Sequence, residues 1–415
     1  MQRHTIVNFR LLILTFLEYF VWGAWIVPIS SYMNGNLGFS GTEIGWICGA
    51  SALGALVSPL FVGYVADRYV ATEKVLAVLH LVGALCLYLA VCFHDFPGLM
   101  TLVVIDALFF MPTLSLVNNL VFRHLDDATR FPRIVVGGDV GWITAGLMVG
   151  FVLGERSGSF FLLASAAEAV LALYCLTLPY TPPKGGTQSA REKLGLSAAS
   201  LLKERAFLIF AIAIPLVTIS KTYYTTWTNA FLAEISIPKP AAMMTLSQLS
   251  ELGTMIVMPW IISKVGLKNI LMLGMMAWTA RYLLFAAMHP VAVVAGLLLH
   301  GFSYGFVVTG SSMYAARVAP PGMSARAQSF VTLLILGIGM FAGAQVAGYT
   351  GQSYQAVTIS VARPANPGGY EQARVPLPEW NDLVSSTAIR GTRANPMARR
   401  EDSAFVSTTV TSPEQ

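Results

Sequence analysis

The sequence predicts an all-α membrane protein, and three observations carry this prediction. Hydrophobic residues make up 55% of the 415 residues, whereas charged residues make up only 11%, well below the roughly 25% that is typical of soluble domains. Apolar stretches of about 20 residues, the length that crosses the roughly 30 Å core of a bilayer, recur along the chain. Lysine and arginine gather in alternate connections between these stretches, as expected for membrane helices.

We expect about eleven transmembrane helices, most of them joined by short connections. The connection over 181–205 is polar and rich in proline, glycine and charge, and it separates six spans from five. The sequence therefore predicts a six-helix bundle over 1–180, a cytoplasmic linker over 181–205 and a five-helix bundle over 206–349. The expected spans are 7–31, 42–66, 72–93, 97–120, 134–155, 159–180, 206–232, 242–263, 268–288, 291–315 and 324–349.

The basic residues predict how the chain is oriented. With the N-terminus in the cytoplasm, sixteen lysines and arginines fall in cytoplasmic segments, and only Arg156 and Lys239 fall in external loops. Cytoplasmic loops of membrane proteins carry such an excess of positive residues. We therefore expect an integral protein of a bacterial-type cytoplasmic (inner) membrane, with its N-terminus and its linker in the cytoplasm.

The segment over 350–415 is polar, with proline, arginine, serine and threonine throughout. No window in it approaches 20 apolar residues, so we expect it to be mostly disordered. With eleven spans this segment would emerge outside the cell, against the charge bias of the other loops. The hypothesis that a twelfth span is missing accounts for this.

The composition and the motifs also exclude classes of function. The basic residues lie between apolar runs rather than in a patch, so the net charge of +5 does not indicate a nucleic-acid partner. Cys48, Cys86, Cys92 and Cys175 lie in apolar segments without metal-ligand spacing, so we expect no metal or other cofactor. The chain contains neither H-E-x-x-H nor G-x-S-x-G, so we expect no catalytic residues and no enzymatic activity.

A motif after the second expected span resembles one found in the major facilitator superfamily. Gly63-Tyr-Val-Ala-Asp67-Arg68 is similar to the superfamily's G-x-x-x-D-R loop between its second and third helices. The glycine there allows helices to approach closely. With two sets of spans joined by a cytoplasmic linker, the resemblance implies a two-bundle fold. Substrate would bind between the bundles, which rock to open the site to either side in turn.

Further stretches resemble one branch of the superfamily, the nucleoside:proton symporters, in order over residues 10 to about 349. The resemblance implies a monomer in the lipid bilayer that takes up nucleosides together with protons. The matching stretches are Leu17–Trp25, Met111–Asn118, Phe131–Ile134 with Gly141–Trp142, Asn229–Leu232, Ser247–Glu251 and Ala277–Arg281.

Glu251 is the strongest candidate for transport chemistry, because an ionisable group inside a span costs several kcal/mol unless it is paired or hydrated. It lies three residues after Gln248, so the two share a helix face. A carboxylate beside an amide offers acceptors and donors to sugar hydroxyls, and in a low-dielectric cavity it can load and release a proton. The resemblance places both residues in the substrate site. A hydrogen bond between helices, with no ligand, is the alternative.

The resemblance implies further substrate contacts, each with a packing alternative of comparable weight. Thr222 and Thr225 match polar positions of the seventh helix, and Trp142 could stack on a nucleobase. His300 and Tyr304 are four residues apart and share a face of the tenth span.

Four other ionisable residues in the spans are less readily assigned. Glu18 and Arg281 fit structural partners better than substrate ligands, and the sequence assigns no role to Asp106 or Glu168.

The chain departs from the family pattern at three positions in the expected cavity. Val135 stands where the family has an arginine, Asp139 where a hydroxyl is expected, and Gly305 where an aspartate is usual. Asp139 is therefore a second candidate for proton coupling. Lys221, which adjoins Thr222, either pairs with such a carboxylate or extends to the membrane interface. These departures leave three alternatives open: altered nucleoside coupling, a carrier of sugars or other polar metabolites, and a degenerate homologue that does not transport.

Overall fold

The computed structural model describes residues 2–125, 131–183, 196–320 and 323–361, and within these ranges the regular structure is entirely helical. Residues Met1–Val357 form one compact unit, and Thr358–Gln415 form a second. Most of the second unit, and with it most of the segment expected to be disordered, lies outside the described residues. The fold below is that of the first unit.

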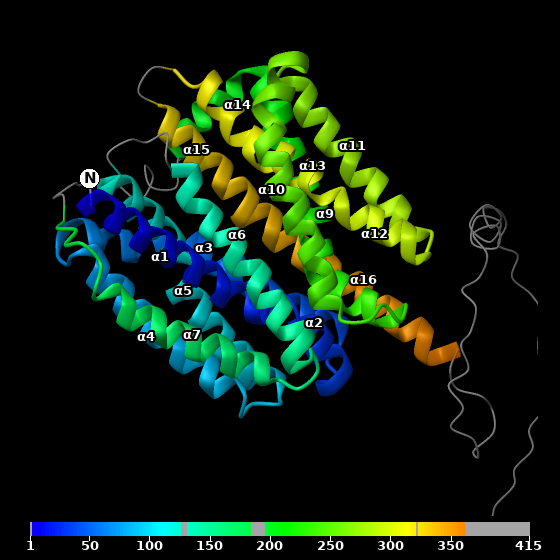
Figure 1. The fold of residues 1–415 in the computed structure, drawn as a ribbon. Helices are drawn as coiled ribbons and strands as arrows, with labels where there is room; N and C mark the ends of the chain where they lie inside the picture. The colour runs from blue at the N-terminus through cyan, green and yellow to red at the C-terminus, as the bar shows by residue number, and fades with distance from the viewer. Residues whose placement is uncertain (1, 126–130, 184–195, 321–322, 362–415) are drawn as a thin grey trace, which may run out of the picture. The chain divides into compact units, whose positions relative to one another are not determined.

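The N-terminal half consists of long helices that pack side by side (Figure 1). α1 packs along α6 and α7, α4 packs between α5 and α7, and α3 lies against α5. Two short segments, α2 (Ile29–Tyr32) and η1 (Met33–Leu37), connect α1 to α3, and η3 (Val149–Leu153) extends α6. The long helices are α1 (Gln2–Ile26), α3 (Gly41–Arg68), α4 (Thr72–Ala90), α5 (Phe96–His124), α6 (Phe131–Met148) and α7 (Ser159–Cys175).

The C-terminal half follows a short 3₁₀ helix, η4 (Leu196–Lys203), at the end of the expected linker. α10 packs against α12 and α13, and α11 packs against the same two segments. The elements of this half are α9 (Arg205–Glu234), α10 (Pro240–Val265), α11 (Leu267–Ala286), α12 (Pro290–Leu298), α13 (His300–Tyr304), η5 (Gly305–Thr309), α14 (Gly310–Val318), α15 (Ser324–Thr332), η6 (Leu333–Gly339) and α16 (Met340–Val361).

Eight helical segments of the described chain are long and apolar enough to cross a membrane, and Ser159–Cys175 is apolar but shorter. The all-helical membrane fold is therefore confirmed, whereas the count of eleven spans stays a prediction. The last helix, α16, continues to Val361 and so extends beyond the expected end of the last span at 349.

The two halves meet closely where α3 begins and α16 passes it. A methyl group at Gly45 would lie 2.6 Å from the carbonyl oxygen of Ala344 and 2.8 Å from the Cα of Gly348. A methyl group at Gly41 would lie 2.1 Å from the backbone nitrogen of Gln352. Only glycine fits at such distances, so the backbones of α3 and α16 are in direct contact.

A second close contact joins α6 and η3 to the start of α10. A methyl group at Gly150 would lie 2.7 Å from the backbone nitrogen of Ala242, and one at Gly146 would lie 3.1 Å from the carbonyl oxygen of Ala241. Ser31 of α2 also donates a hydrogen bond to Asn229 of α9. We call this end of the two halves, defined by Gly41, Gly45, Gly150 and their partners, the closed end.

Candidate functional site

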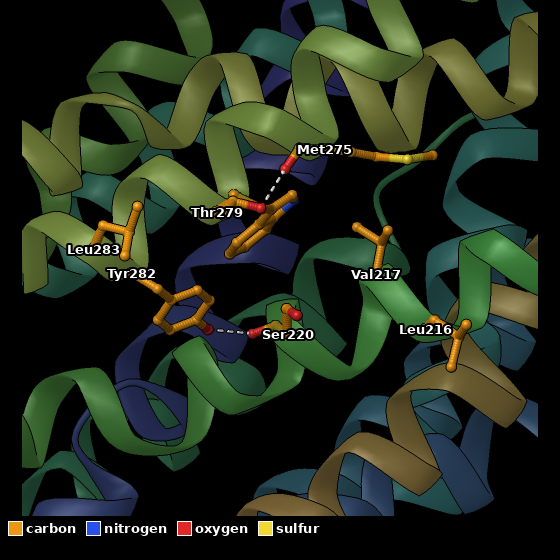
Figure 2. Close-up of a pocket in the computed structure, with 8 residues that line it drawn as sticks. Leu216, Val217, Ser220, Met275, Thr279, Tyr282 and Leu283 are labelled. Carbon is orange, nitrogen blue, oxygen red and sulfur yellow. Dashed lines mark hydrogen bonds between the residues drawn. The ribbon is translucent and has the colours of Figure 1, made fainter. Parts of the chain in front are cut away.

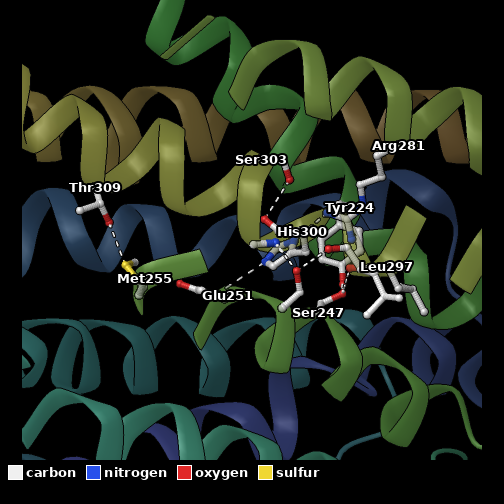
Figure 3. Close-up of polar contacts among 12 residues, drawn as sticks. Tyr224, Ser247, Glu251, Met255, Arg281, Leu297, His300, Ser303 and Thr309 are labelled. Atoms are coloured by element: carbon white, nitrogen blue, oxygen red, sulfur yellow. Dashed lines mark hydrogen bonds and ion pairs between the residues drawn. The ribbon is translucent and has the colours of Figure 1, made fainter. Parts of the chain in front are cut away.

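Glu251 of α10 faces His300 of α13, and Figure 3 shows the pair among its polar neighbours. The Glu251 side chain is 14% exposed, and its Oε2 lies 4.0 Å from Nε2 of His300. Gly301 brings the two helices together, because a methyl group there would lie 2.2 Å from the carbonyl oxygen of Ser250. The hydroxyl of Ser250 donates to the carbonyl oxygen of Leu298, which fixes α10 against the α12–α13 segment.

The charged groups that act on Glu251 come from both halves of the protein. Asp139 of α6 and Lys221 of α9 both interact electrostatically with its carboxyl group. The hydroxyl of Tyr19 in α1 also interacts electrostatically with both Asp139 and Glu251. Glu251 is therefore a half-buried carboxyl group with one like and one opposite charge acting on it, one from each half.

Lys221 lies over an aromatic ring. Its Nζ is 5.4 Å from the centre of the Tyr304 ring, within the range of a cation–π interaction. The sequence had offered Asp139 as a partner for this lysine, but the partner that the structure defines geometrically is Tyr304. The lysine charge nevertheless acts on Glu251, so Lys221 belongs to the same cluster.

Gln248 lies one helical turn before Glu251 and has an unsatisfied acceptor. Its amide Oε1 is buried and has no hydrogen-bond partner. A buried acceptor without a donor costs about 1–3 kcal/mol, so a hydroxyl group that enters beside Glu251 would recover this energy. The shared face expected from the sequence thus carries one acceptor that no described group satisfies.

Arg281 of α11 is fully buried behind His300. Its guanidinium carbon lies 3.5 Å from the centre of the Tyr224 ring and 5.1 Å from that of Trp278. The hydroxyl of Tyr224 is 2.9 Å from that of Ser247 in α10, so a hydrogen bond connects the ring under Arg281 to α10. The geometry fits the structural role that the sequence suggested for Arg281, and not a ligand contact.

The two threonines of α9 that were predicted to contact substrate differ in how deeply they are buried. Thr222 is 2% exposed, its hydroxyl donates to the carbonyl oxygen of Thr218, and its side chain packs on Gly343. We therefore leave Thr222 out of the proposed site. Thr225, by contrast, is only half-buried.

Trp142 of α6 packs against α1 but stays partly exposed. Its ring packs on Gly23 and meets the Trp22 ring edge-on, with 5.5 Å between ring centres. The Trp142 side chain is nevertheless only half-buried, so both a packing role and a stacking role stay open.

The Gly63–Arg68 motif lies within the last turns of α3 and not in a loop after it. The Arg68 guanidinium carbon is 5.7 Å from the centre of the Tyr69 ring. The side chain of Asp67 and the surroundings of Gly63 lie outside the described part of the chain, so the conformational role of the motif stays a prediction.

A groove of about 480 Å³ lies between α9 and α11, and Trp278, whose ring also lies near Arg281, is one of its lining residues. Figure 2 shows its walls, where the hydroxyl of Tyr282 donates to the carbonyl oxygen of Ser220. Leu216 and Leu283, which also line it, are 60% and 70% exposed. None of its lining residues is a predicted site residue, and the groove has no part in the mechanism below.

The fold and the site together define a membrane transporter and not an enzyme, with ionisable and hydrogen-bonding groups from both halves around a central position. The chain belongs to the nucleoside H+ symporter family, whose model matches residues 5–360.

Related proteins agree with this assignment. YegT of Escherichia coli (strain K12) is 35% identical over 354 residues, which are 82% of this chain and 83% of that protein. The nucleoside permease NupG of the same organism is 29% identical, over 84% of this chain and 88% of its own. A crystal structure of the nucleoside transporter NupG matches with a TM-score of 0.77 and 28% identity, over 84% of this chain and 91% of the solved one.

Proposed function

We propose that the protein takes up nucleosides across the cytoplasmic membrane together with protons, and that Glu251 carries the proton. The observation that supports this most directly is that Glu251 and the unpaired amide oxygen of Gln248 share a face of α10. The Glu251 carboxyl group also interacts electrostatically with Asp139 of the other half. Substrate and proton would thus meet at one position between the halves.

The charges around Glu251 suggest how loading and movement are coupled. With Asp139 ionised and Lys221 positive, a protonated Glu251 makes the three side chains neutral in sum, whereas an ionised Glu251 leaves one net negative charge. Moving a net charge within a low-dielectric bundle is costly. The two halves would therefore rearrange most readily when Glu251 is protonated, with a ribose hydroxyl on Gln248 and Glu251.

The aromatic residues of the cavity would hold the base. Every nucleobase presents a π-face that stacks on aromatic side chains, an interaction worth about 1–3 kcal/mol per base. Trp142 of α6 and Tyr304 of α13 are the rings on either half that the resemblance assigns to this task. Thr225 of α9 would add a hydroxyl contact.

The direction in which the cavity opens follows from the closed end and the predicted orientation. With the N-terminus in the cytoplasm, the start of α3 and the end of α16 lie on the outer side of the membrane. The backbone contacts at Gly45 and Gly150 would then close the outer side, and the conformation would face the cytoplasm. In this arrangement the protein would act as a monomer, since each chain supplies both halves of its site.

Uptake of radiolabelled uridine or adenosine into transport-deficient cells tests the proposal. We expect wild-type accumulation to collapse with an uncoupler. Glu251→Gln should lose accumulation driven by the proton gradient but retain exchange across the membrane. Asp95→Asn, at the exposed N-cap of α5, is the matched control and should behave as wild type. Accumulation that ignores the gradient would remove the coupling claim, and competition by hexoses but not nucleosides would favour the sugar carrier instead.

A further inference from the structure

A second group of ionisable side chains lies inside the N-terminal half, away from Glu251. It joins Glu18 of α1, His80 of α4, Asp106 of α5 and Glu168 of α7. Glu18, His80 and Glu168 are 0% exposed, and Asp106 is 1% exposed. We call these four residues the buried acid cluster, and neither the resemblance nor the proposed transport mechanism assigns it a role.

His80 bridges two of the carboxyl groups of the cluster. Its Nε2 lies 3.2 Å from Oε2 of Glu18, and its Nδ1 lies 3.2 Å from Oε1 of Glu168. Gly83, one turn along α4, makes room for the second contact, because a methyl group there would lie 2.3 Å from Oε1 of Glu168. Three helices thus contribute a carboxyl, an imidazole and a second carboxyl group, and the Nε2 of His80 is within ion-pair distance of Glu18 without a hydrogen bond between them.

The environment of Glu18 indicates a bound proton. The hydroxyl of Thr113 lies 2.5 Å from Oε1 of Glu18 and also 2.5 Å from the carbonyl oxygen of Phe110. A hydroxyl group has a single hydrogen, and the carbonyl oxygen is always an acceptor. Both contacts are satisfied together when Glu18 is protonated, because its O–H then donates to Thr113 while Thr113 donates to Phe110.

The contact between His80 and Glu168 places one hydrogen between the two side chains. The imidazole donates from Nδ1 to the Glu168 carboxylate, either as an imidazolium or as the neutral tautomer with its hydrogen on Nδ1, or it accepts at Nδ1 from a protonated Glu168. The contact therefore fixes a hydrogen between Nδ1 and Oε1, and the charge balance of the whole cluster decides how many further protons are bound.

Asp106 supplies an independent indication, because both of its carboxyl oxygens are buried and have no hydrogen-bond partner. Its charge interacts electrostatically with Glu168 and His80. An ionised carboxylate that is buried without donors costs several kcal/mol. Two thiols also interact electrostatically with the cluster: Cys86 with Asp106 and Glu168, and Cys175 with Glu18.

The charges of the cluster cannot balance without bound protons. Three ionised carboxyl groups and one imidazolium would leave a net charge of −2 in a dry interior, and the ion pairs that the structure describes for these carboxyl groups are those with His80. Among the described residues, no group of His, Cys, Asp and Glu has an arrangement that could hold a metal ion. Protons are therefore the ligand that fits this site.

We propose that the buried acid cluster is a second proton-binding site, which holds protons on Glu18 and Asp106, beside the hydrogen-bonded pair of His80 and Glu168. It is linked to the group around Glu251 through α1 and α6. Glu18 is followed in α1 by Tyr19, whose ring packs on Gly138, the residue before Asp139. The proposal does not depend on Glu251, so the two proton sites can be tested separately.

Infrared spectroscopy of the full-length protein in liposomes tests the second site, since a protonated carboxyl group has a carbonyl stretching band that a carboxylate lacks. The reference is the Glu251→Gln, Asp139→Asn double variant at neutral pH, in which the carboxyl groups of the central cavity are gone. We expect a protonated-carboxyl band to persist in it. Adding Asp106→Asn should remove the intensity of one carboxyl group, and adding Glu18→Gln should do the same.

Both changes keep the size of the side chain and replace a group that we propose to be neutral, so the protein should fold. Asp95→Asn in the same reference is the control and should leave the band unchanged. The absence of a protonated-carboxyl band in the reference, or a band that neither Asp106→Asn nor Glu18→Gln reduces, would overturn the proposal. Failure of proton-driven uptake alone would contradict only the role of Glu251.

Discussion

The guanidinium of Arg281 lies 2.7 Å, through Nη1, from Nδ1 of His300. Because a guanidinium only donates hydrogen bonds, Nδ1 of His300 must accept, and the imidazole must be neutral with its hydrogen on Nε2. That hydrogen points to the side of Glu251, whose Oε2 is 4.0 Å away. Arg281 thus acts as a positioning residue that keeps His300 neutral, which leaves Glu251 as the proposed proton carrier of the pair.

Substitution of His300 tests this relationship. Glutamine can accept from Arg281 with its carbonyl oxygen and donate to Glu251 with its amide, so His300→Gln should keep most of the uptake rate. His300→Leu leaves a buried guanidinium without its acceptor, which costs about 1–3 kcal/mol and should lower the rate by about 5- to 150-fold. Initial uptake rates, normalised to the amount of protein in the membrane, measure the difference. Equal rates for the two variants would contradict the tautomer argument.

Gln248 should affect the affinity for substrate rather than proton coupling. Gln248→Leu removes the amide that we propose binds a ribose hydroxyl, and one lost hydrogen bond of about 1–1.5 kcal/mol should raise KM by roughly 5- to 15-fold. The maximal rate should stay within about twofold, because Glu251 is intact. Concentration-dependent uridine uptake gives both quantities. Gln328→Leu, at an exposed position of α15, is the control. A change confined to the maximal rate would exclude a binding role.

The sequence was sufficient for contacts that lie close along the chain and insufficient for those between distant helices. The shared face of Gln248 and Glu251 follows from a spacing of three residues, and the membrane fold follows from the apolar spans. The bridge from Glu18 through His80 to Glu168 joins three helices far apart in the sequence. A single histidine in an apolar span gives no signal that distinguishes it from packing.

The helix contacts that depend on glycine were also beyond prediction from the sequence. The close approach of α3 to α16 depends on Gly45 and Gly348 meeting across the two halves, which no local pattern predicts because glycine is common throughout membrane helices. The resemblance assigned Glu251 and His300 to different spans of one cavity, and this assignment stays a prediction. It could not give their distance or the protonation imposed by Arg281.

Enlarging Gly45 should open the closed end. A methyl group there already meets the backbone of α16 at 2.6 Å, so Gly45→Val forces the helices apart and should lower uptake at least tenfold, because alternating access requires this end to close. Gly253→Ala is the matched control, since nothing lies within 4 Å of a methyl group at that position. Uptake assays compare the two variants with wild type.

A cysteine introduced at the contact of α3 and α16 distinguishes opening of the closed end from misfolding of the protein. Ala344→Cys places a thiol at a fully buried position of this contact, and Cys92, the one free cysteine that is exposed in the described chain, is first changed to serine. Maleimide labelling of position 344 should rise in the Gly45→Val variant and not with Gly253→Ala. Unchanged labelling in a well-folded Gly45→Val protein would show that the end closes without this glycine.

Glu155 should make the closed end sensitive to pH. Its carboxylate accepts a hydrogen bond of 2.6 Å from the backbone N–H of Ala241, at the start of α10. Burial raises the pKa of Glu155, and the Ala241 hydrogen bond and the charge of Arg156 only partly oppose this. When this end opens and the side chain is hydrated, its pKa should return to about 4.3. Protonation therefore favours the closed end, and this advantage is lost as pH rises through the raised pKa.

The labelling of Ala344→Cys measures this effect across the acidic range. In Glu155→Gln the side chain can still accept from Ala241 but cannot titrate, so its labelling changes with pH through the thiolate fraction alone. We expect the labelling of the Glu155 protein, divided by that of Glu155→Gln at the same pH, to increase above about pH 4.3 and to level off above the raised pKa of Glu155. A ratio that falls with rising pH would show that the sign is wrong.

Gly305→Asp should place a second carboxyl group on the cavity side of α10. A methyl group at position 305 would meet Thr254 at 3.5 Å and Met255 at 3.9 Å, ordinary contact distances, so the substitution should be tolerated. These neighbours lie about one helical turn from Glu251, or roughly 5 Å along the helix axis. In a Glu251→Gln background, Gly305→Asp should restore part of the accumulation driven by the proton gradient, because a carboxyl group again faces the cavity. Gly305→Asn has the same size but cannot carry a proton, and should restore none. Recovery with asparagine equal to that with aspartate would mean that side-chain volume, and not the proton, limits the Glu251→Gln variant.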